Sequence, residues 1–339
     1  MKKVKVEDSL GLELCHDMTK VVPGEFKGAA FKRGHIIRAE DLPELLSMGK
    51  EHIYVWEDNA GEIHEDDAAV RLAAAVAGEH VRCSAPEEGK SVLTAAGKGL
   101  FRLHSELLSE INAVPDVTIP CLPRNFSVEG GQKVASARIV PLVTQEKNIL
   151  RVETLCRENG PVFSVQPYRP LRAALVVTGS EVYKGLIEDK FAPVLRQKLA
   201  GFEAEIISTA YCPDDRDLIR EAILAAVAAA AELVLVTGGM SVDPDDLTPG
   251  AIKSTGAEIV AHGLPAQPGN MFLAAYLGDV PVFGVPGAAI YLSVTVLDVL
   301  LPRIFAGDRL EKKDLARLAE GGLCAGCAVC NYPYCYFGR

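Results

Sequence analysis

From Leu171 to Ala306 the sequence alternates between short apolar runs and amphipathic segments, and this alternation restricts the fold more than any other feature. The run Ala173–Thr178 is followed by Gly179 and is typical of a strand that is buried on both faces. Further strands are predicted at 205–208, 233–237, 258–261 and 281–285, and helices at 191–199, 214–227 (N-capped by Asp214), 251–254 and 288–301. Because strands that alternate with helices form right-handed crossovers, we expect an α/β fold: a mainly parallel sheet with helices on both faces.

Three of these strands end in turns that contain glycine. The turns are Thr178-Gly179-Ser180-Glu181, Thr237-Gly238-Gly239-Met240-Ser241 and Gly284-Val285-Pro286-Gly287. Glycine lets the backbone come close to a ligand, and parallel sheets bind ligands at the carboxyl ends of their strands. The turns together predict a cleft of backbone N–H donors that suits a phosphate or another anion. The alternative is that the glycines only make strand-to-helix turns.

Three carboxylates follow the second turn within four residues, at Asp243, Asp245 and Asp246. They would repel a bound phosphate unless they held Mg²⁺, which prefers carboxylate and phosphate oxygens. We therefore expect Asp246, with Asp243 and Asp245 as lesser candidates, to hold a divalent ion or to act in catalysis. The alternative is helix capping, with Thr248 as the cap of a helix that begins at Pro249.

The rest of the chain divides into an N-terminal region, a linker and a tail. Residues 1–168 read as an α+β region that by pattern alone indicates no function. Strands are expected there at 3–6, 52–56, 117–119, 132–142, 149–155 and 162–165, and helices at 39–49, 67–77 and 91–111. The prolines of the linker 166–170 disfavour helix. The α/β domain is expected at 171–306, and a charged, then Cys-rich, tail at 308–339.

The tail holds four of the nine cysteines, Cys324, Cys327, Cys330 and Cys335. An odd total without a signal peptide argues against a disulfide framework. The spacing Cys-x2-Cys-x2-Cys is close to that of a 4Fe–4S ligand run, whereas structural zinc sites usually draw on two separated pairs. We expect an Fe–S cluster or zinc at these four residues; a redox or structural thiol tail, or no role, stays open.

Charge and hydropathy exclude two classes of partner. The formal net charge is −10, so there is no overall positive field to attract nucleic acid. No apolar run approaches the roughly 20 residues that a membrane-spanning helix needs. The sequence thus predicts a cytoplasmic protein with neither nucleic acid nor a membrane as partner.

The domain 171–306 resembles the molybdopterin-binding domain shared by MoeA, MogA and CinA-like proteins, and is closest to MoeA-like molybdopterin molybdenumtransferases. The first turn resembles Thr-Gly-Asp-Glu of MoeA, and the segment 236–246 is similar to the family's Ser-Gly-Gly-Val-Ser loop with its downstream Asp at Asp246. The segments 265–270 and 283–289 resemble the Lys-Pro-Gly and Gly-Leu-Pro-Gly-Asn-Pro loops, and 31–56 resembles the segment that precedes this domain in MoeA.

The resemblance implies molybdenum cofactor biosynthesis. It implies a cleft that binds molybdopterin or its adenylylated form, a transferase that inserts molybdate with Mg²⁺, and a homo-oligomer that has a molybdoenzyme as a possible partner. The residues that it implies for the pterin and its phosphate are Thr178, Gly179, Ser180, Glu181, Thr237, Gly238, Gly239, Ser241, Pro268, Gly269, Pro286 and Gly287.

Three departures from the family pattern keep other functions open. Ser180 stands where MoeA has Asp, Gln267 where it has Lys, and Ala288-Ala289 where it has Asn-Pro. The lost acid and the lost lysine favour a non-catalytic carrier or sensor of the cofactor, whereas Asp246 favours an enzyme. A CinA-like nucleotide hydrolase is the third alternative.

Overall fold

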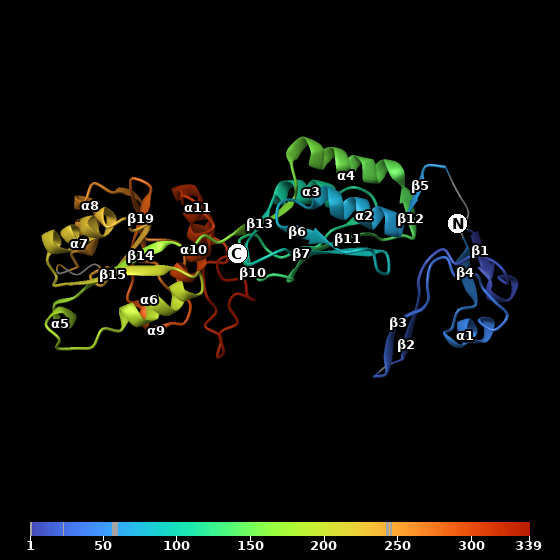
Figure 1. Ribbon diagram of the computed structural model, residues 1–339, viewed down its shortest axis with the longest axis horizontal. Coiled ribbons are helices and arrows are strands. Elements are labelled where there is room, and N and C mark those ends of the chain that lie inside the picture. The colour runs from blue at the N-terminus through green and yellow to red at the C-terminus, as the bar shows by residue number, and fades with distance from the viewer. Residues whose placement is uncertain (1, 23, 56–59, 242–243, 245) are drawn as a thin grey trace. The chain divides into compact units, whose positions relative to one another are not determined.

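The computed structural model describes residues 2–22, 24–55, 60–241, 244 and 246–339. The chain divides into two compact units (Figure 1). The first unit comprises residues up to Val165 except for two short segments, 98–100 and 123–127. The second unit comprises these two segments and residues 166–339.

A six-stranded sheet is the centre of the second unit, with the order β15-β14-β16-β19-β18-β17. The strands are β14 (Arg172–Thr178), β15 (Glu205–Cys212), β16 (Leu233–Thr237), β17 (Glu258–His262), β18 (Leu273–Leu277) and β19 (Val280–Val285). The pairs β14–β15, β14–β16 and β16–β19 are parallel, and β18 is antiparallel to both of its neighbours. The mainly parallel sheet predicted from the alternating pattern is confirmed, with the unpredicted β18 as an antiparallel addition.

Helices cover both faces of this sheet, as predicted. They are α5 (Ser180–Tyr183), α6 (Phe191–Ala200), α7 (Arg216–Ala228), α8 (Thr248–Ser254), α9 (Ala288–Tyr291) and α10 (Val296–Phe305). Leu175 of β14 belongs to the core shared with α6 and α10, whereas Val176 belongs to the core shared with α7 and α8. Figure 1 accordingly shows α7 and α8 on one side of β14 and α6 on the other. The continuous apolar run of β14 reflects burial on both faces.

The predicted closing helix 288–301 is in fact two helices. The chain is extended at Leu292, and α10 then begins after Thr295, which forms a capping box with Asp298. The Thr295 hydroxyl accepts a hydrogen bond from the Leu297 N–H, and Asp298 accepts one from the Thr295 N–H at 2.7 Å. Pro302 was expected to stop the helix but lies inside α10. The local cap therefore sets the start of the helix.

Asp298 also pairs with Lys198 of α6 at 2.6 Å, and both side chains are largely buried. We expect Asp298→Ala to lower the free energy of unfolding by roughly 3 kcal/mol, because it removes a cap and leaves a buried ammonium without its anionic partner. Urea denaturation measures this. Asp279→Ala, at a fully exposed carboxylate, is the matched control and should change the free energy by less than about 0.5 kcal/mol. Equal effects of the two variants would contradict the expectation.

Before β14, the described residues form several small sheets and four α-helices. The strands are β1 (Lys2–Lys5), β2 (Met18–Val22), β3 (Phe26–Phe31), β4 (His52–Val55), β5 (Glu62–His64), β6 (Val81–Cys83), β7 (Lys90–Ala95), β8 (Gly99–Leu103), β9 (Val117–Thr118), β10 (Phe126–Val128), β11 (Lys133–Ile139), β12 (Val143–Gln145) and β13 (Phe163–Pro167). The helices are α1 (Leu42–Ser47), α2 (Glu65–Val76), α3 (Ser105–Asn112) and α4 (Glu146–Asn159). The pairings are β1-β4, β2-β3, β12-β5, β6-β7-β11-β9 and β10-β8-β13.

Two predictions for this region are wrong. The helix expected at 91–111 is instead β7, β8 and α3, because alternate residues of β7 are buried and glycines at 97 and 99 follow it. The strand expected at 149–155 is part of α4, whose buried residues Ile149, Val152 and Cys156 recur at helical spacing. The helix predicted at 67–77 is confirmed as α2.

The tail contains one short α-helix, α11 (Lys312–Ala316), which a 3-10 turn at Arg317–Ala319 continues, and no helix follows it. Leu323 forms a parallel bridge with Gln267, and the Cys324 N–H donates to the Gln267 carbonyl at 2.8 Å. The tail is thereby fastened to the loop before β18. In the parts of the chain described above, no helix is long and apolar enough to cross a membrane.

Candidate functional site

The three glycine turns lie side by side at one edge of the sheet. In the register of the adjacent strands β14, β16 and β19, Val177 is level with Thr237, and Thr237 is level with Val285. The strands therefore end at the same height, and their turns follow at the carboxyl edge. This is the edge where parallel sheets bind ligands.

Gly238 makes the closest contact between two of the turns. Its φ is +86°, and a Cβ there would lie 2.3 Å from the Thr178 carbonyl oxygen. No other residue fits at this position, since a side chain would overlap the first turn. The packing of the two turns alone therefore explains the glycine at position 238, and no ligand is needed to account for it.

Gly239 has more space around its Cα than Gly238 has. Its φ is +54°, and a Cβ would come within 3.1 Å of the Thr248 hydroxyl. The Gly239 carbonyl accepts from the Thr248 N–H at 3.3 Å, and the hydroxyls of Thr248 and Thr178 lie 3.3 Å apart. The start of α8 is therefore fastened to two turns. The N-cap residue of α8 is Leu247 and Thr248 is already the first residue of the helix, so Thr248 is not the cap that the alternative proposed.

Thr237 is the buried polar residue of this edge that lacks a partner. Its side chain is fully buried, and its Oγ1 makes no hydrogen bond within the described residues. An unsatisfied buried hydroxyl costs about 1–3 kcal/mol. A ligand that offers a polar atom here would remove that cost, so the position fits a polar ligand better than an apolar one.

Asp214 joins the first turn, which the sequence did not predict. Its carboxylate accepts from the Ser180 N–H at 2.8 Å, and its own N–H donates to the Ser180 hydroxyl at 3.2 Å. The N-cap of α7 is instead Asp215, which accepts from the N–H groups of the two residues at 217 and 218. A carboxylate is thus present beside Ser180, contributed by Asp214. The sequence signal for this contact was the pair of adjacent acids, Asp214 and Asp215, that follows β15. Helix capping explains only one of the two.

Asp246 lies between the second turn and α8 and is half-buried. Its Cα is 3.6 Å from the place that a Cβ on Gly239 would take. Asp243 and Asp245 lie outside the described residues. Of the three predicted acids, the structure therefore places Asp246 beside the glycine turn.

The other residues predicted to bind the ligand either have open space around them or pack elsewhere in the domain. A Cβ on Gly287 would meet no atom within 4 Å, and one on Gly179 would meet only Glu181 Oε2 at 3.8 Å. The loop at Pro268 and Gly269 instead packs on the start of α10, where the Pro268 carbonyl accepts from the Val296 N–H at 3.0 Å. Pro286 and the exposed Ser241 complete the third and second turns.

The tail cysteines do not converge on a metal site. Cys324, Cys327 and Cys330 are exposed, and Cys335 is half-buried. Within the residues that the structure describes, no three or more His, Cys, Asp or Glu side chains are grouped so that they could hold a metal ion. The expected Fe–S or zinc centre is therefore not formed in this structure. The main-chain bonds between the tail and Gln267 place Cys324 on an extended segment, where its thiol faces solvent.

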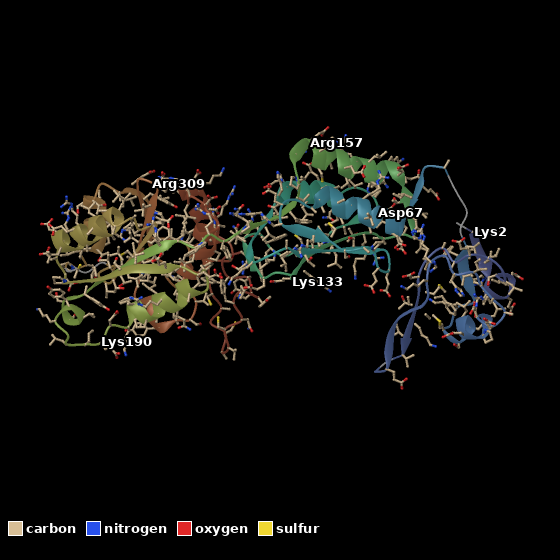
Figure 2. All side chains as sticks on the ribbon, in the orientation of Figure 1. Lys2, Asp67, Lys133, Arg157, Lys190 and Arg309 are labelled. Atoms are coloured by element: carbon tan, nitrogen blue, oxygen red, sulfur yellow. The ribbon has the colours of Figure 1, made fainter. Side chains whose placement is uncertain are left out.

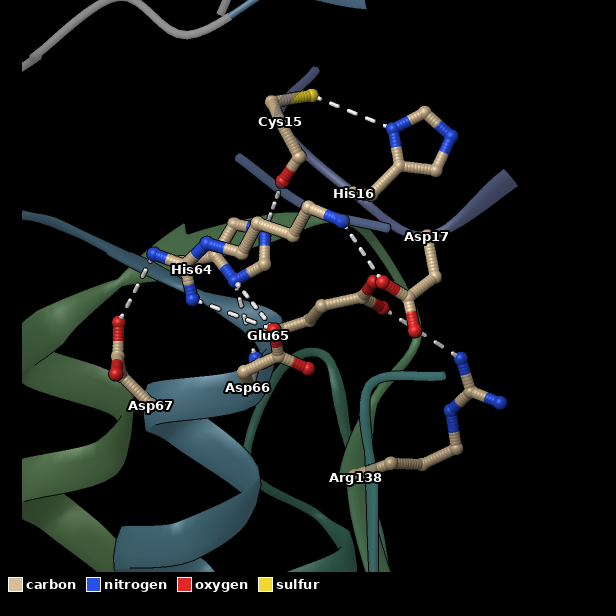
Figure 3. Close-up of polar contacts among 9 residues, drawn as sticks. Cys15, His16, Asp17, His64, Glu65, Asp66, Asp67 and Arg138 are labelled. Carbon is tan, nitrogen blue, oxygen red and sulfur yellow. Dashed lines mark hydrogen bonds and ion pairs between the residues drawn. The ribbon is translucent and has the colours of Figure 1, made fainter. Parts of the chain in front are cut away.

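A second cluster of ionisable groups lies in the first unit, around the start of α2 (Figure 3). Glu65 is only 6% exposed, and its carboxylate is 3.8 Å from Arg138. Burial, with Asp66 and Asp17 nearby, raises the pKa of Glu65 to about 7, although Arg138 and Arg33 oppose the shift. Glu65 lies just before the helix that the sequence predicts at 67–77, and no sequence pattern indicated a role for it.

Two histidines and a thiol border the same cluster. His64 bonds to the Cys15 carbonyl, and its Nδ1 accepts from the Asp66 N–H, so it caps α2. Burial lowers the pKa values of His64 and His16. Burial also raises the pKa of Cys15 to about 11, so its thiol stays protonated at neutral pH.

The raised pKa of Glu65 predicts a pH-dependent stability. As the pH rises from 4.5 to about 7, the unfolded chain loses this proton before the folded chain does, so folding becomes progressively less favourable. Above that range the cost is full, at about 3 kcal/mol. We expect Glu65→Gln to raise the free energy of unfolding at pH 8.5 by up to that amount and by clearly less at pH 5.

Urea denaturation at the two pH values measures this difference. Glu106→Gln, at an exposed carboxylate of α3, is the matched control. A gain from Glu65→Gln that is the same at both pH values would contradict a shifted titration.

Comparisons with known proteins give two family matches. Residues 174–306 match a family described as "probable molybdopterin binding domain", and residues 3–57 match a domain of unknown function. The first match covers the sheet and all three glycine turns.

Two curated relatives come from Synechococcus elongatus. One, a "molybdenum cofactor biosynthesis bifunctional protein", is 37% identical over 86 residues, which are 25% of this chain and 27% of that protein. The other, a molybdopterin molybdenumtransferase, is 26% identical over 211 residues, which are 59% of this chain and 52% of that protein. The chain thus matches about half or less of the length of these relatives.

Among solved structures, the molybdopterin biosynthesis MoeA protein from Pyrococcus horikosii is similar to 90% of this chain, with 75% of its own length covered. The two are 16% identical, and the TM-score is 0.35. Such a TM-score does not establish a shared overall fold.

Proposed function

Because residues 174–306 belong to the molybdopterin-binding domain family, we propose that this chain acts in molybdenum cofactor biosynthesis, as a transferase that binds molybdopterin or its adenylylated form and promotes molybdate insertion. The observation that carries this proposal is the alignment of three glycine turns at the carboxyl edge of one sheet. Their neighbouring backbones offer a surface that an anionic ligand can approach closely.

Within that surface we assign different roles to the turns. Gly179 and Gly287 leave open space where the phosphate of the ligand would lie. Thr237 contributes the buried hydroxyl that a polar ligand atom would satisfy. Gly238 keeps the first two turns in contact and so positions the surface without itself touching the ligand.

Asp246 is our candidate for the chemical step. Insertion joins molybdate to the two sulfurs of the dithiolene, and one oxo group leaves as water with the two thiol protons. A carboxylate near the reacting atoms can carry these protons from sulfur to oxygen. Asp246 lies beside Gly239 and is half-buried, which suits this role.

The acids that the structure describes at this edge, Asp214, Glu181 and Asp246, do not form a group that could hold a metal ion. We propose that Asp246 acts as a carboxylate in its own right.

Gly239→Asp tests the anion site, with Gly239→Asn as its matched control. Both side chains tolerate a positive φ, and both meet the Thr248 hydroxyl alike, so they differ mainly in charge. We expect the Asp variant to bind purified molybdopterin about tenfold more weakly than the Asn variant, since a charge near phosphate costs roughly 1–2 kcal/mol in a partly solvated site. Equal affinities of the two variants in a titration would contradict an anion at this turn.

Asp246→Asn tests the chemical role. The substitution is nearly isosteric and should leave the fold and molybdopterin binding intact. We expect molybdate-dependent maturation of the cofactor to fall by about 10²-fold or more, as for the loss of a general acid–base group. The control is Asp217→Asn at an exposed position of α7, which should keep the rate. Turnover near that of the unmodified protein would instead favour the non-catalytic carrier.

A further inference from the structure

Three exposed thiols are gathered in one short loop of the tail. Cys324, Cys327 and Cys330 are free and exposed, and two residues separate each from the next. The spacers are Ala-Gly and Ala-Val, and none of the residues 323–331 is charged. Figure 2 shows the side chains of the tail on a segment that projects from the second unit. No bulky side chain in the loop keeps the thiols apart, and no acid in it opposes their ionisation.

Both ends of this loop are fastened to the second unit. At its start, the Gln267 N–H donates to the Gly322 carbonyl at 2.7 Å, and the Cys324 N–H donates to the Gln267 carbonyl at 2.8 Å. At its end, the Tyr332 hydroxyl donates to the Asp298 carbonyl at 3.0 Å. The three thiols are therefore held in one small volume, which raises the concentration that each presents to the others.

The middle of the loop brings two of the three thiols toward each other. The main chain bends at Ala328 and Val329, between Cys327 and Cys330. In the part of the chain that the structure describes, residues 325–330 take part in no main-chain hydrogen bond. A disulfide needs two Cα atoms about 4.4–6.8 Å apart. Cys327 and Cys330 can adopt this spacing without breaking a main-chain bond, whereas Cys324 is held by Gln267.

The cysteines outside the tail are less suited to thiol chemistry. Burial raises the pKa to about 11 at Cys15, Cys121 and Cys156. It also raises the pKa values of Cys83 and Cys212. Because the thiolate is the reactive form, these five cysteines stay protonated and slow to react at neutral pH. Thiol reactivity is thereby concentrated in the tail.

We propose that Cys327 and Cys330 form a thiol–disulfide exchange site that takes a small-molecule disulfide as its oxidant. One thiolate attacks a sulfur of the small disulfide, whose S–S bond breaks and releases one thiol. The second thiolate then attacks the mixed disulfide and releases the other thiol. The chain gains one S–S bond and gives up two electrons and two protons, which the small disulfide takes up as it becomes two thiols. Excess small thiol drives the same steps in reverse. This site does not depend on the ligand of the glycine turns.

Oxidation by glutathione disulfide is the direct test. The reduced full chain is incubated with it, the remaining free thiols are alkylated, and fragment-ion mass spectrometry locates the disulfide. We expect one disulfide, between Cys327 and Cys330, which excess reduced glutathione reverses. Cys327→Ser and Cys330→Ser should each slow the loss of free thiols about tenfold or more, since the mixed disulfide then lacks its nearby second thiol.

Two other cysteines provide matched controls. Cys324→Ser changes the third thiol of the loop, and Cys83→Ser changes an exposed cysteine of the first unit. Both variants should keep the rate of oxidation and the pairing. A disulfide that joins any other pair, or tail thiols that glutathione disulfide leaves free, overturns the proposal. Zinc or iron that copurifies in equal amount with the chain and protects the tail thiols from oxidation also overturns it, in favour of metal ligation.

Discussion

The contact between Gly238 and the Thr178 carbonyl is the constraint on which the rest of the candidate site depends. It brings two strand ends together without intervening side chains, and it leaves the Thr178 hydroxyl to meet Thr248 at the start of α8. The orientation of α8 then places Asp246 beside Gly239. A side chain at position 238 would separate the turns, and the arrangement of the acid, the helix and the glycine edge would be lost with them.

The α/β half of the fold could be predicted because its determinants are local. Strands such as β14 and β16 are buried on both faces and read as unbroken apolar runs that glycine ends. Their parallel pairing follows from the alternation with helices. The break before α10 was not predicted, since apolar residues continue at Leu292 and Val294 and only the cap at Thr295 reveals the boundary. Strand β18 was not predicted, because no helix precedes it and the alternation of strands with helices therefore does not mark it.

The first unit could not be predicted equally well, because its periodicity is ambiguous. Leucine and isoleucine spacing across 91–111 suits a helix, yet the pairing of β7 with β11 determines the structure there. Sequence identified the three glycine turns, but it indicated neither the contact of Asp214 with the first turn nor, in the first unit, the burial of Glu65 beside Arg138. Both depend on contacts with residues more than 30 positions away, Ser180 and Arg138 respectively, and such contacts have no local sequence signal.

The composition of the second unit decides how this protein can be dissected. Besides residues 166–339, that unit includes the short segments 98–100 and 123–127. Ser127 accepts from the Tyr168 hydroxyl at 2.7 Å, and the Arg339 guanidinium lies 4.5 Å from the centre of the Phe126 ring. A fragment cut at Gln166 would lose these partners and expose the surfaces that they cover. A single truncation therefore cannot isolate the sheet and its turns with a complete core.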